Sequence, residues 1–78
     1  MEETTLHPIE RGRRARGWSR AELASRVGVR VNTVRDWERG AMPRGKNLRA
    51  LARAFGVDLL QLADEILAWR QAQSRCRS

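Results

Sequence analysis

The chain has little cysteine, histidine or proline: its 78 residues include one cysteine, one histidine and two prolines. A single cysteine, Cys76, excludes an internal disulfide framework. His7 and Cys76 are each alone of their kind, so the sequence holds no cluster with metal-ligand spacing. Neither residue has a catalytic partner near it in the sequence, and both lie in segments expected to fray. We therefore expect neither an enzyme nor a bound metal or cofactor.

Long apolar runs are also missing. No segment approaches the roughly 18 apolar residues of a membrane-spanning helix, and the start of the chain lacks the pattern of a signal peptide. No motif for a small-molecule ligand is evident. We expect a cytoplasmic protein that has no membrane partner.

Acidic residues are few, and they are unevenly placed. Nine acidic residues face sixteen basic ones, which gives a net charge of +7 and a pI near 11.6. The charge is −3 over residues 1–10, +10 over residues 11–56 and zero over residues 57–78. Arginine outnumbers lysine fifteen to one, which indicates a compositional bias as well, but bias alone does not explain the clustering. The concentrated positive charge is typical of a protein that binds a polyanion.

A helix is predicted to begin at Ser19. Ser19 and Glu22 have the spacing of a capping box. Trp18 and Leu23, on either side of this start, have the spacing of a hydrophobic staple. Gly28 is free to take a positive φ and is expected to end the helix.

A second helix is predicted from Val31 to Arg39, with Gly40 as its stop signal. Val34 and Trp37 are its inward-facing pair on a helical wheel. Two short helices joined by a tight turn that contains glycine have the geometry of a helix-turn-helix.

The opposite side of this second helix is polar. It carries Asn32, Arg35, Asp36 and Arg39. A polar stripe on an amphipathic helix is in most cases only a solvated surface. The positive charge concentrated in the same region favours a binding surface instead.

Three further helices are predicted from apolar spacing and start signals. They cover about Leu6 to Ala15, about Lys46 to Phe55, and a fifth that begins after Asp58, where Gln61 has the spacing of a reciprocal capping partner. Gly12 costs about 1 kcal/mol relative to alanine inside a helix, so we expect it to mark a close helix approach.

Arg13 and Glu38 are expected to form an ion pair. Glu38 lies in the last turn of its helix, where the macrodipole disfavours an acid by about 0.3–1 kcal/mol. Arg13 projects from the apolar side of the first helix and is the candidate partner. The alternative is that both are exposed and unpaired.

Several segments form one longer pattern: Arg13, then GWSRAELA and VGV between residues 17 and 29, then TVRDWERG at residues 33–40. Further positions follow in register: Pro43, Asn47, Leu48, Leu51, Ala52, Phe55, Gly56 and Val57. Over about residues 9–63 this pattern resembles the phage-repressor/Cro-type (Xre-like) helix-turn-helix family. Arg30 departs from the pattern, because the family often has a capping residue there.

The resemblance implies an all-α fold: a compact bundle of about five helices with a central helix-turn-helix, here with a fifth helix extended at its C-terminus. It also divides the chain. Residues 1–5 are expected to be a flexible acidic N-terminus, 6–63 a DNA-binding domain, 64–73 a helical extension and 74–78 a disordered tail.

The resemblance further implies which residues contact DNA, by placing the helix at 31–39 in the major groove. Positions that match base-reading residues of the family, or adjoin them, are Arg30, Val31, Asn32, Arg35 and Asp36. Positions that match phosphate contacts are Ser19, Arg20, Arg39, Arg44 and Lys46. The Arg13–Glu38 pair matches a buried ion pair of phage-repressor members.

We therefore expect a sequence-specific double-stranded DNA-binding transcriptional regulator, a repressor that is associated with the nucleoid and forms a homodimer at least on DNA. The alternative is a protein-interaction module of the same fold, such as an antitoxin or a bridging factor. In the extension, Ile66, Leu67 and Trp69 are expected to form a dimer contact, the alternative being that they cap the bundle within one molecule.

Overall fold

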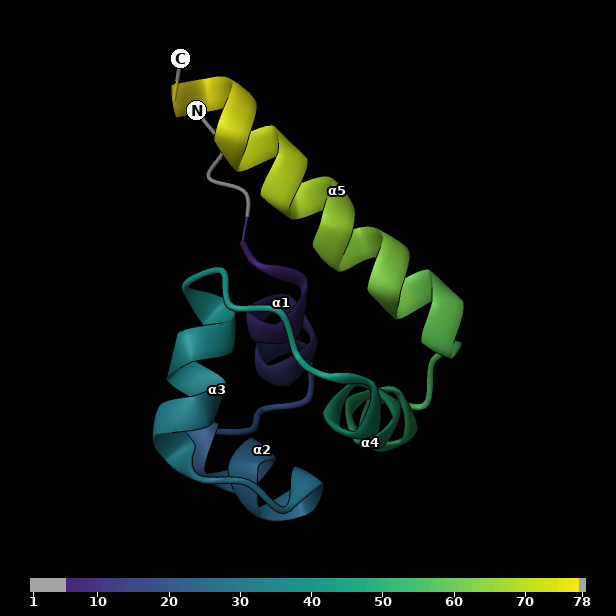
Figure 1. Ribbon diagram of the computed structural model, residues 1–78. Helices are drawn as coiled ribbons and strands as arrows, with labels where there is room; N and C mark the ends of the chain where they lie inside the picture. The colour runs from purple at the N-terminus through teal and green to yellow at the C-terminus, as the bar shows by residue number, and fades with distance from the viewer. Residues whose placement is uncertain (1–5, 78) are drawn as a thin grey trace.

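The computed structural model describes the backbone of residues 6–77 and the side chains of residues 6–73. Within that part the chain forms five helices, α1 (Pro8–Ala15), α2 (Arg20–Val27), α3 (Val31–Glu38), α4 (Gly45–Phe55) and α5 (Leu59–Arg77). In Figure 1, α5 runs past α1 and α4, which it contacts, and α2 packs against both α3 and α4. The predicted all-α bundle with a central helix-turn-helix is therefore confirmed.

The helix ends follow local signals. The Ser19 hydroxyl accepts a bond from the Glu22 amide at 3.1 Å, and the Glu22 carboxylate accepts one from the Ser19 amide at 2.8 Å, so the capping box is complete. Gly28 has a φ of +88° and Gly56 a φ of +70°, the left-handed conformation in which glycine avoids the steric cost that a Cβ imposes. Arg30, at the start of α3, makes no capping bond with its side chain. The start of α3 is thus the least firmly capped junction of the helix-turn-helix.

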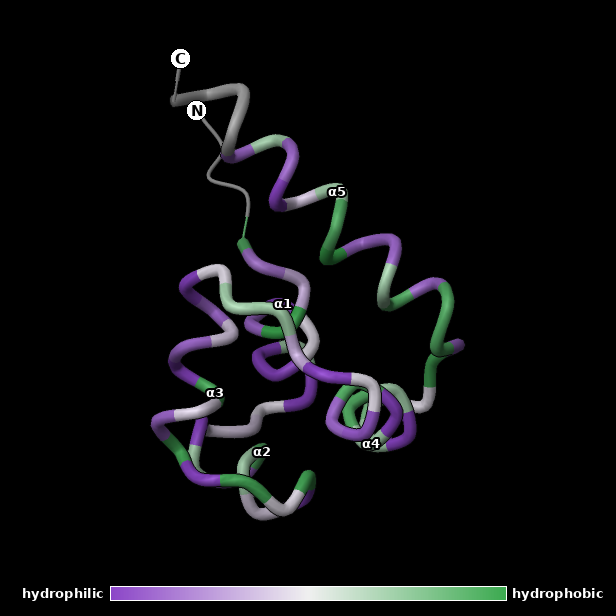
Figure 2. The backbone as a smooth tube through the Cα atoms, viewed as in Figure 1, coloured by the Kyte–Doolittle hydropathy of each residue, from purple (hydrophilic) through white to green (hydrophobic). Residues whose placement is uncertain are grey.

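The core is one cluster of apolar side chains to which every helix contributes. Its fully buried members include Leu23, Val34, Leu51 and Ile66, each 0% exposed. Figure 2 shows hydrophobic residues recurring along the first part of α5. Burying apolar surface contributes about 25 cal/mol per Å², so these contacts are the main term that holds the five short elements together.

Gly12 marks a close approach, as predicted. A Cβ on Gly12 would lie 3.0 Å from the Phe55 ring. The same ring also meets Trp18, which stacks on Phe55 with ring centroids 6.2 Å apart. The missing side chain at position 12 therefore lets α1 seat directly against the end of α4.

His7 differs from the prediction. It was expected in a fraying end, and α1 was expected to begin at Leu6, yet the His7 side chain is 2% exposed. Its Nδ1 accepts a bond from the Ile9 amide at 3.0 Å and so caps α1, which begins at Pro8. Its ring meets the Trp69 ring edge to face, with centroids 4.6 Å apart. His7 is thus a buried cap between α1 and α5.

Two predictions about the C-terminal extension are also corrected. Ile66 is 0% exposed and belongs to the core, so it is not available for a dimer contact, whereas Trp69 is half-buried and packs on His7, which favours the alternative that it caps the bundle within one molecule. Of the three residues only Leu67 stays open, at 47% exposed. Helix α5 continues to Arg77, so the backbone at residues 74–77 is helical where a disordered tail was expected. The predicted flexible segment 1–5 lies outside the described residues.

Among the described helices none is long and apolar enough to cross a membrane. The same part of the chain holds no group of three or more residues that are suited to bind a metal ion.

Candidate nucleic-acid interface

Helix α3 buries one side and leaves the other open. Val34 is 0% exposed and Trp37 is 4% exposed, which fixes the inward side. The five positions predicted to read bases are all exposed: Arg30, Val31, Asn32, Arg35 and Asp36. Figure 2 shows α3 as a largely hydrophilic helix. Val31, which lies near the core boundary on a helical wheel, is 40% exposed and belongs to this open side.

The polar groups on the open side of α3 have no side-chain partner in the part of the chain that the structure describes. The side chains of Arg30, Asn32, Arg35 and Asp36 form no hydrogen bond or ion pair with any described residue. Asp36 in particular pairs with neither Arg35 nor Arg39. Hydrogen-bond donors and acceptors on this side of α3 are therefore available to an external partner.

Glu38 fastens the end of α3 to the two helices before it. Its side chain is 3% exposed, and its Oε2 accepts a bond from Arg13 Nε at 2.8 Å. Its Oε1 accepts a second bond, from Arg20 Nε at 2.9 Å. Arg13 also donates to the Trp18 carbonyl at 3.1 Å. The ion pair expected between Arg13 and Glu38 is present, and it sets the position of α3 relative to α1 and α2.

Arg20 therefore has a different local role from the one the sequence suggested. It was assigned to phosphate contact alone, yet its Nε is engaged by Glu38. Its side chain is 42% exposed, so the rest of the guanidinium still reaches the surface. Ser19, the neighbouring phosphate candidate, uses its hydroxyl oxygen and its amide in the capping box. Its hydroxyl proton remains available to an acceptor.

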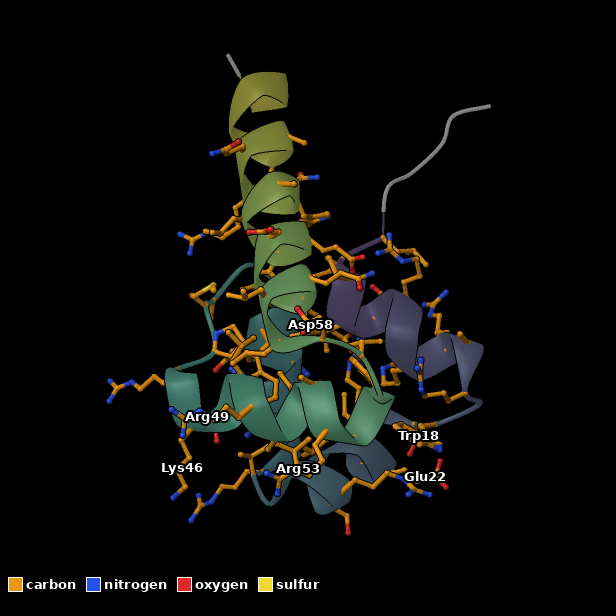
Figure 3. All side chains as sticks on the ribbon, turned by 90° about the vertical axis from the view of Figure 1, so that its right-hand side faces the viewer. Trp18, Glu22, Lys46, Arg49, Arg53 and Asp58 are labelled. Atoms are coloured by element: carbon orange, nitrogen blue, oxygen red, sulfur yellow. The ribbon has the colours of Figure 1, made fainter. Side chains whose placement is uncertain are left out.

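The other phosphate candidates are exposed and unpaired within the described residues: Arg39, Arg44 and Lys46. Arg39 and Arg44 flank the loop between α3 and α4, and Lys46 lies in the first turn of α4. Figure 3 shows Lys46 projecting from one end of α4. Contacts to the phosphate backbone beside an inserted helix need exposed cations of this kind.

A family model described as helix-turn-helix matches residues 9–62 of the chain. The chain belongs to the Xre/Cro-like helix-turn-helix family. It is a DNA-binding helix-turn-helix domain, of a class without enzymatic activity. Among curated proteins, this domain is similar to Multiprotein-bridging factor 1 of Schizosaccharomyces pombe, with 36% identity over 52 residues. The match covers 65% of the chain but only 35% of that protein. No solved structure matches the chain significantly.

Sequence reasoning missed the second partner of Glu38. No local signal links Arg20 to Glu38, because they are 18 residues apart and meet only when α2 packs on α3. Arg49 and Arg53 are a like-charged pair one turn apart on α4, which is unfavourable unless an anion lies near. Both are exposed on α4 and neither forms an ion pair with a described residue.

Proposed function

We propose that the protein is a sequence-specific double-stranded DNA-binding transcriptional regulator, a repressor, that inserts α3 into the major groove. The observation that carries this proposal is the open side of α3, where every predicted base-reading position is exposed and makes no side-chain bond within the described residues. A helix with an anchored inner side and an unused polar outer side matches the requirements of major-groove readout.

The free groups correspond to the donors and acceptors of base edges. Asn32 pairs bidentately with adenine, Arg35 pairs with guanine, and Asp36 accepts from the amino group of cytosine. Val31 suits the methyl group of thymine. Asp36 has no basic partner within the described residues, so nearby phosphates would repel its carboxylate. A hydrogen bond from a cytosine amino group to that carboxylate offsets this repulsion.

The test begins with selection of bound sites from a random pool of DNA duplexes. We expect a defined consensus, and an Asn32→Ala variant should lose discrimination at one base position by about 1–3 kcal/mol. Lys46→Ala is the matched control, since it should weaken binding to the consensus and to random duplex equally. Failure to enrich any sequence would contradict the proposal. Repression is tested by transcription in vitro from a promoter that contains the selected site.

We also propose that two copies bind together, through the outer side of α5. Leu60 is 72% exposed and Leu67 is 47% exposed, and a spacing of seven residues places them on one side of the helix. A twofold dimer of helix-turn-helix domains reads half-sites about 34–36 Å apart. Sedimentation with and without the consensus duplex tests this, with Leu67→Gln expected to reduce a two-protomer complex to one. Binding of single protomers by the unaltered chain would overturn it.

A second candidate function is that of a protein-interaction module, and the likeness to a protein named as a bridging factor favours it. In that case Asn32 and Arg35 would be dispensable for DNA binding, whereas changes on α5 would abolish partner capture. The selection experiment separates the two functions, because an interaction module yields no consensus.

A further inference from the structure

A groove lies between the end of α2 and the outer side of α4. It is lined by Arg26, Val27, Ala50, Arg53 and Ala54. The apolar members are half-buried, whereas the two arginines are exposed. The groove thus has a small apolar floor bordered by a cation from each helix.

The two arginines of the groove have no acidic partner. Neither Arg26 nor Arg53 forms an ion pair with any described residue. Arg49 lies one turn before Arg53 on α4, so the repulsion of about 0.2–0.5 kcal/mol between like charges at this spacing is not relieved within the described part of the chain. Figure 3 shows Arg53 projecting from α4 on the side toward α2. The groove therefore has a local excess of positive charge that an external anion would relieve.

Arg26 is held in place by an aromatic ring. Its guanidinium carbon lies 4.2 Å from the centroid of the Trp18 ring. Stacking uses the face of the guanidinium and leaves the N–H groups on its edge free to bind a carboxylate. Trp18 is itself fixed by stacking on Phe55, with centroids 6.2 Å apart. An arginine held in this way loses less side-chain entropy when it binds a partner.

We propose that this groove docks an acidic, amphipathic segment of a partner protein. Carboxylates of the segment bind Arg26 and Arg53, and its apolar side chains cover Val27, Ala50 and Ala54. Nucleic acid is less suited to the groove, because phosphates would leave that apolar floor uncovered. No residue of α3 lines the groove, so a partner bound here leaves the base-reading side of α3 open, although Lys46 lies one turn before Ala50 on α4. The proposal therefore does not depend on the DNA-reading function.

The test uses a fluorescein-labelled peptide of about 16 residues in which Asp and Glu alternate with Leu and Phe at helical spacing. Its charge-reversed counterpart, with Lys in place of the acids, is the control. We expect saturable binding of the acidic peptide by fluorescence anisotropy. In NMR spectra recorded on addition of the peptide, the largest chemical-shift changes should occur at the methyl groups of Val27, Ala50 and Ala54.

Two double variants with the same change in net charge separate the groove from general electrostatics. Arg26→Gln with Arg53→Gln should weaken the acidic peptide tenfold or more. Arg49→Gln with Arg70→Gln removes two exposed, unpaired cations that do not line the groove, and should change affinity less than twofold. Thermal unfolding of each variant checks that it is folded.

Several outcomes overturn the proposal. Absence of peptide binding does so, as does an equal loss in the two double variants. It also fails if Arg26→Gln with Arg53→Gln weakens a random DNA duplex tenfold, because the groove would then be part of the nucleic-acid interface. If no duplex is bound specifically but the peptide binds as expected, the DNA-reading function fails while this proposal stands.

Discussion

At the C-terminal end of α3, the Glu38 carboxylate accepts two bonds from Arg13 and another from Arg20. The Arg13 side chain is only 10% exposed, so removing Glu38 takes away its closest acidic partner and leaves a longer contact of 4.0 Å with the Glu10 carboxylate. Breaking a buried pair in this way costs about 3–5 kcal/mol. Arg20 is 42% exposed and keeps its hydration, so its share is smaller.

We predict that Glu38→Ala destabilises the protein by about 3 kcal/mol or more in urea unfolding. Double-mutant cycles should give a larger coupling energy with Arg13→Ala than with Arg20→Ala. Glu65→Ala is the control, because Glu65 pairs with Arg11 on the surface, where such pairs contribute about 0–1 kcal/mol. Equal losses for Glu38→Ala and Glu65→Ala would contradict the prediction.

His7 makes stability depend on pH. Burial is the main cause that lowers the pKa of His7 from 6.5 to about 4. The Glu38 charge raises this pKa by a smaller amount, and the Arg11 charge lowers it further. The unfolded chain therefore takes up a proton first, near pH 6.5, and stability falls as the pH drops from 6.5 toward 4. Protonation at Nδ1 would also remove the acceptor that caps α1.

The predicted loss between pH 7.5 and 4.5 is about 2–3 kcal/mol from this residue. His7→Asn keeps a capping side chain but does not titrate, so its unfolding free energy should vary less over the same range. Comparing urea curves of the two proteins at both pH values isolates the histidine from the carboxylates, which titrate in both. Identical pH dependence of the two would disprove the assignment.

At the scale of helices, the junction of α1 with α4 depends on the missing side chain at Gly12. Alanine there would gain about 1 kcal/mol of helix propensity but would place its Cβ 3.0 Å from the Phe55 ring. That ring cannot retreat freely, because Trp18 stacks on it and the Arg16 guanidinium lies 4.8 Å from its centroid. Overpacking of this kind costs about 1–3 kcal/mol.

We predict that Gly12→Ala lowers the unfolding free energy by up to about 2 kcal/mol, the difference between these two terms. Gly45→Ala, in the first turn of α4, is the matched control, because no atom lies within 4 Å of a Cβ there. It should leave stability unchanged or raise it slightly. Thermal unfolding of both variants measures the difference, and equal stabilisation by both would show that Phe55 can move.

Helix boundaries were predictable because their signals are local. The Ser19–Glu22 capping box and the glycines at 28 and 56 lie within a few residues of the ends they set. Asp58 likewise accepts from the Gln61 amide at 3.1 Å, although the Gln61 side chain turns to Glu65 rather than back to the cap. Contacts between distant residues carry no such signal, so the burial of His7 by Trp69 and the Arg20–Glu38 bond were missed.

The candidate site was predictable in part for the same reason. Periodicity alone separated Val34 and Trp37 from the polar side of α3, and the structure places these residues accordingly. It was harder to predict which side of α5 is buried, because Ile66 and Leu67 are adjacent and both apolar. Only the position of α1 and α4 decides that Ile66 is buried and Leu67 is open.

Across the part of the chain that the structure describes, paired and unpaired cations are unevenly distributed. Of the thirteen basic residues between Arg11 and Arg53, four form ion pairs with described acids: Arg11, Arg13, Arg14 and Arg20. Three of these four are on α1. The cations from Arg30 to Lys46 have no acidic partner in the described part of the chain, so unpaired positive charge gathers at α3 and the loop after it, in addition to the unpaired arginines of α2 and α4.

This distribution of unpaired cations predicts that DNA binding weakens steeply with salt, and that the slope depends on where a charge is removed. With about five phosphates contacted per protomer, log K should fall against log salt with a slope near −4 to −5. Arg44→Gln should reduce the magnitude of that slope by about 1. Arg14→Gln removes the same charge from α1, where Arg14 is bound to Glu10 at 2.6 Å, and should leave the slope almost unchanged. Titrations of the selected duplex at several salt concentrations measure both slopes, and an equal reduction by the two variants would mean that net charge rather than its position governs binding.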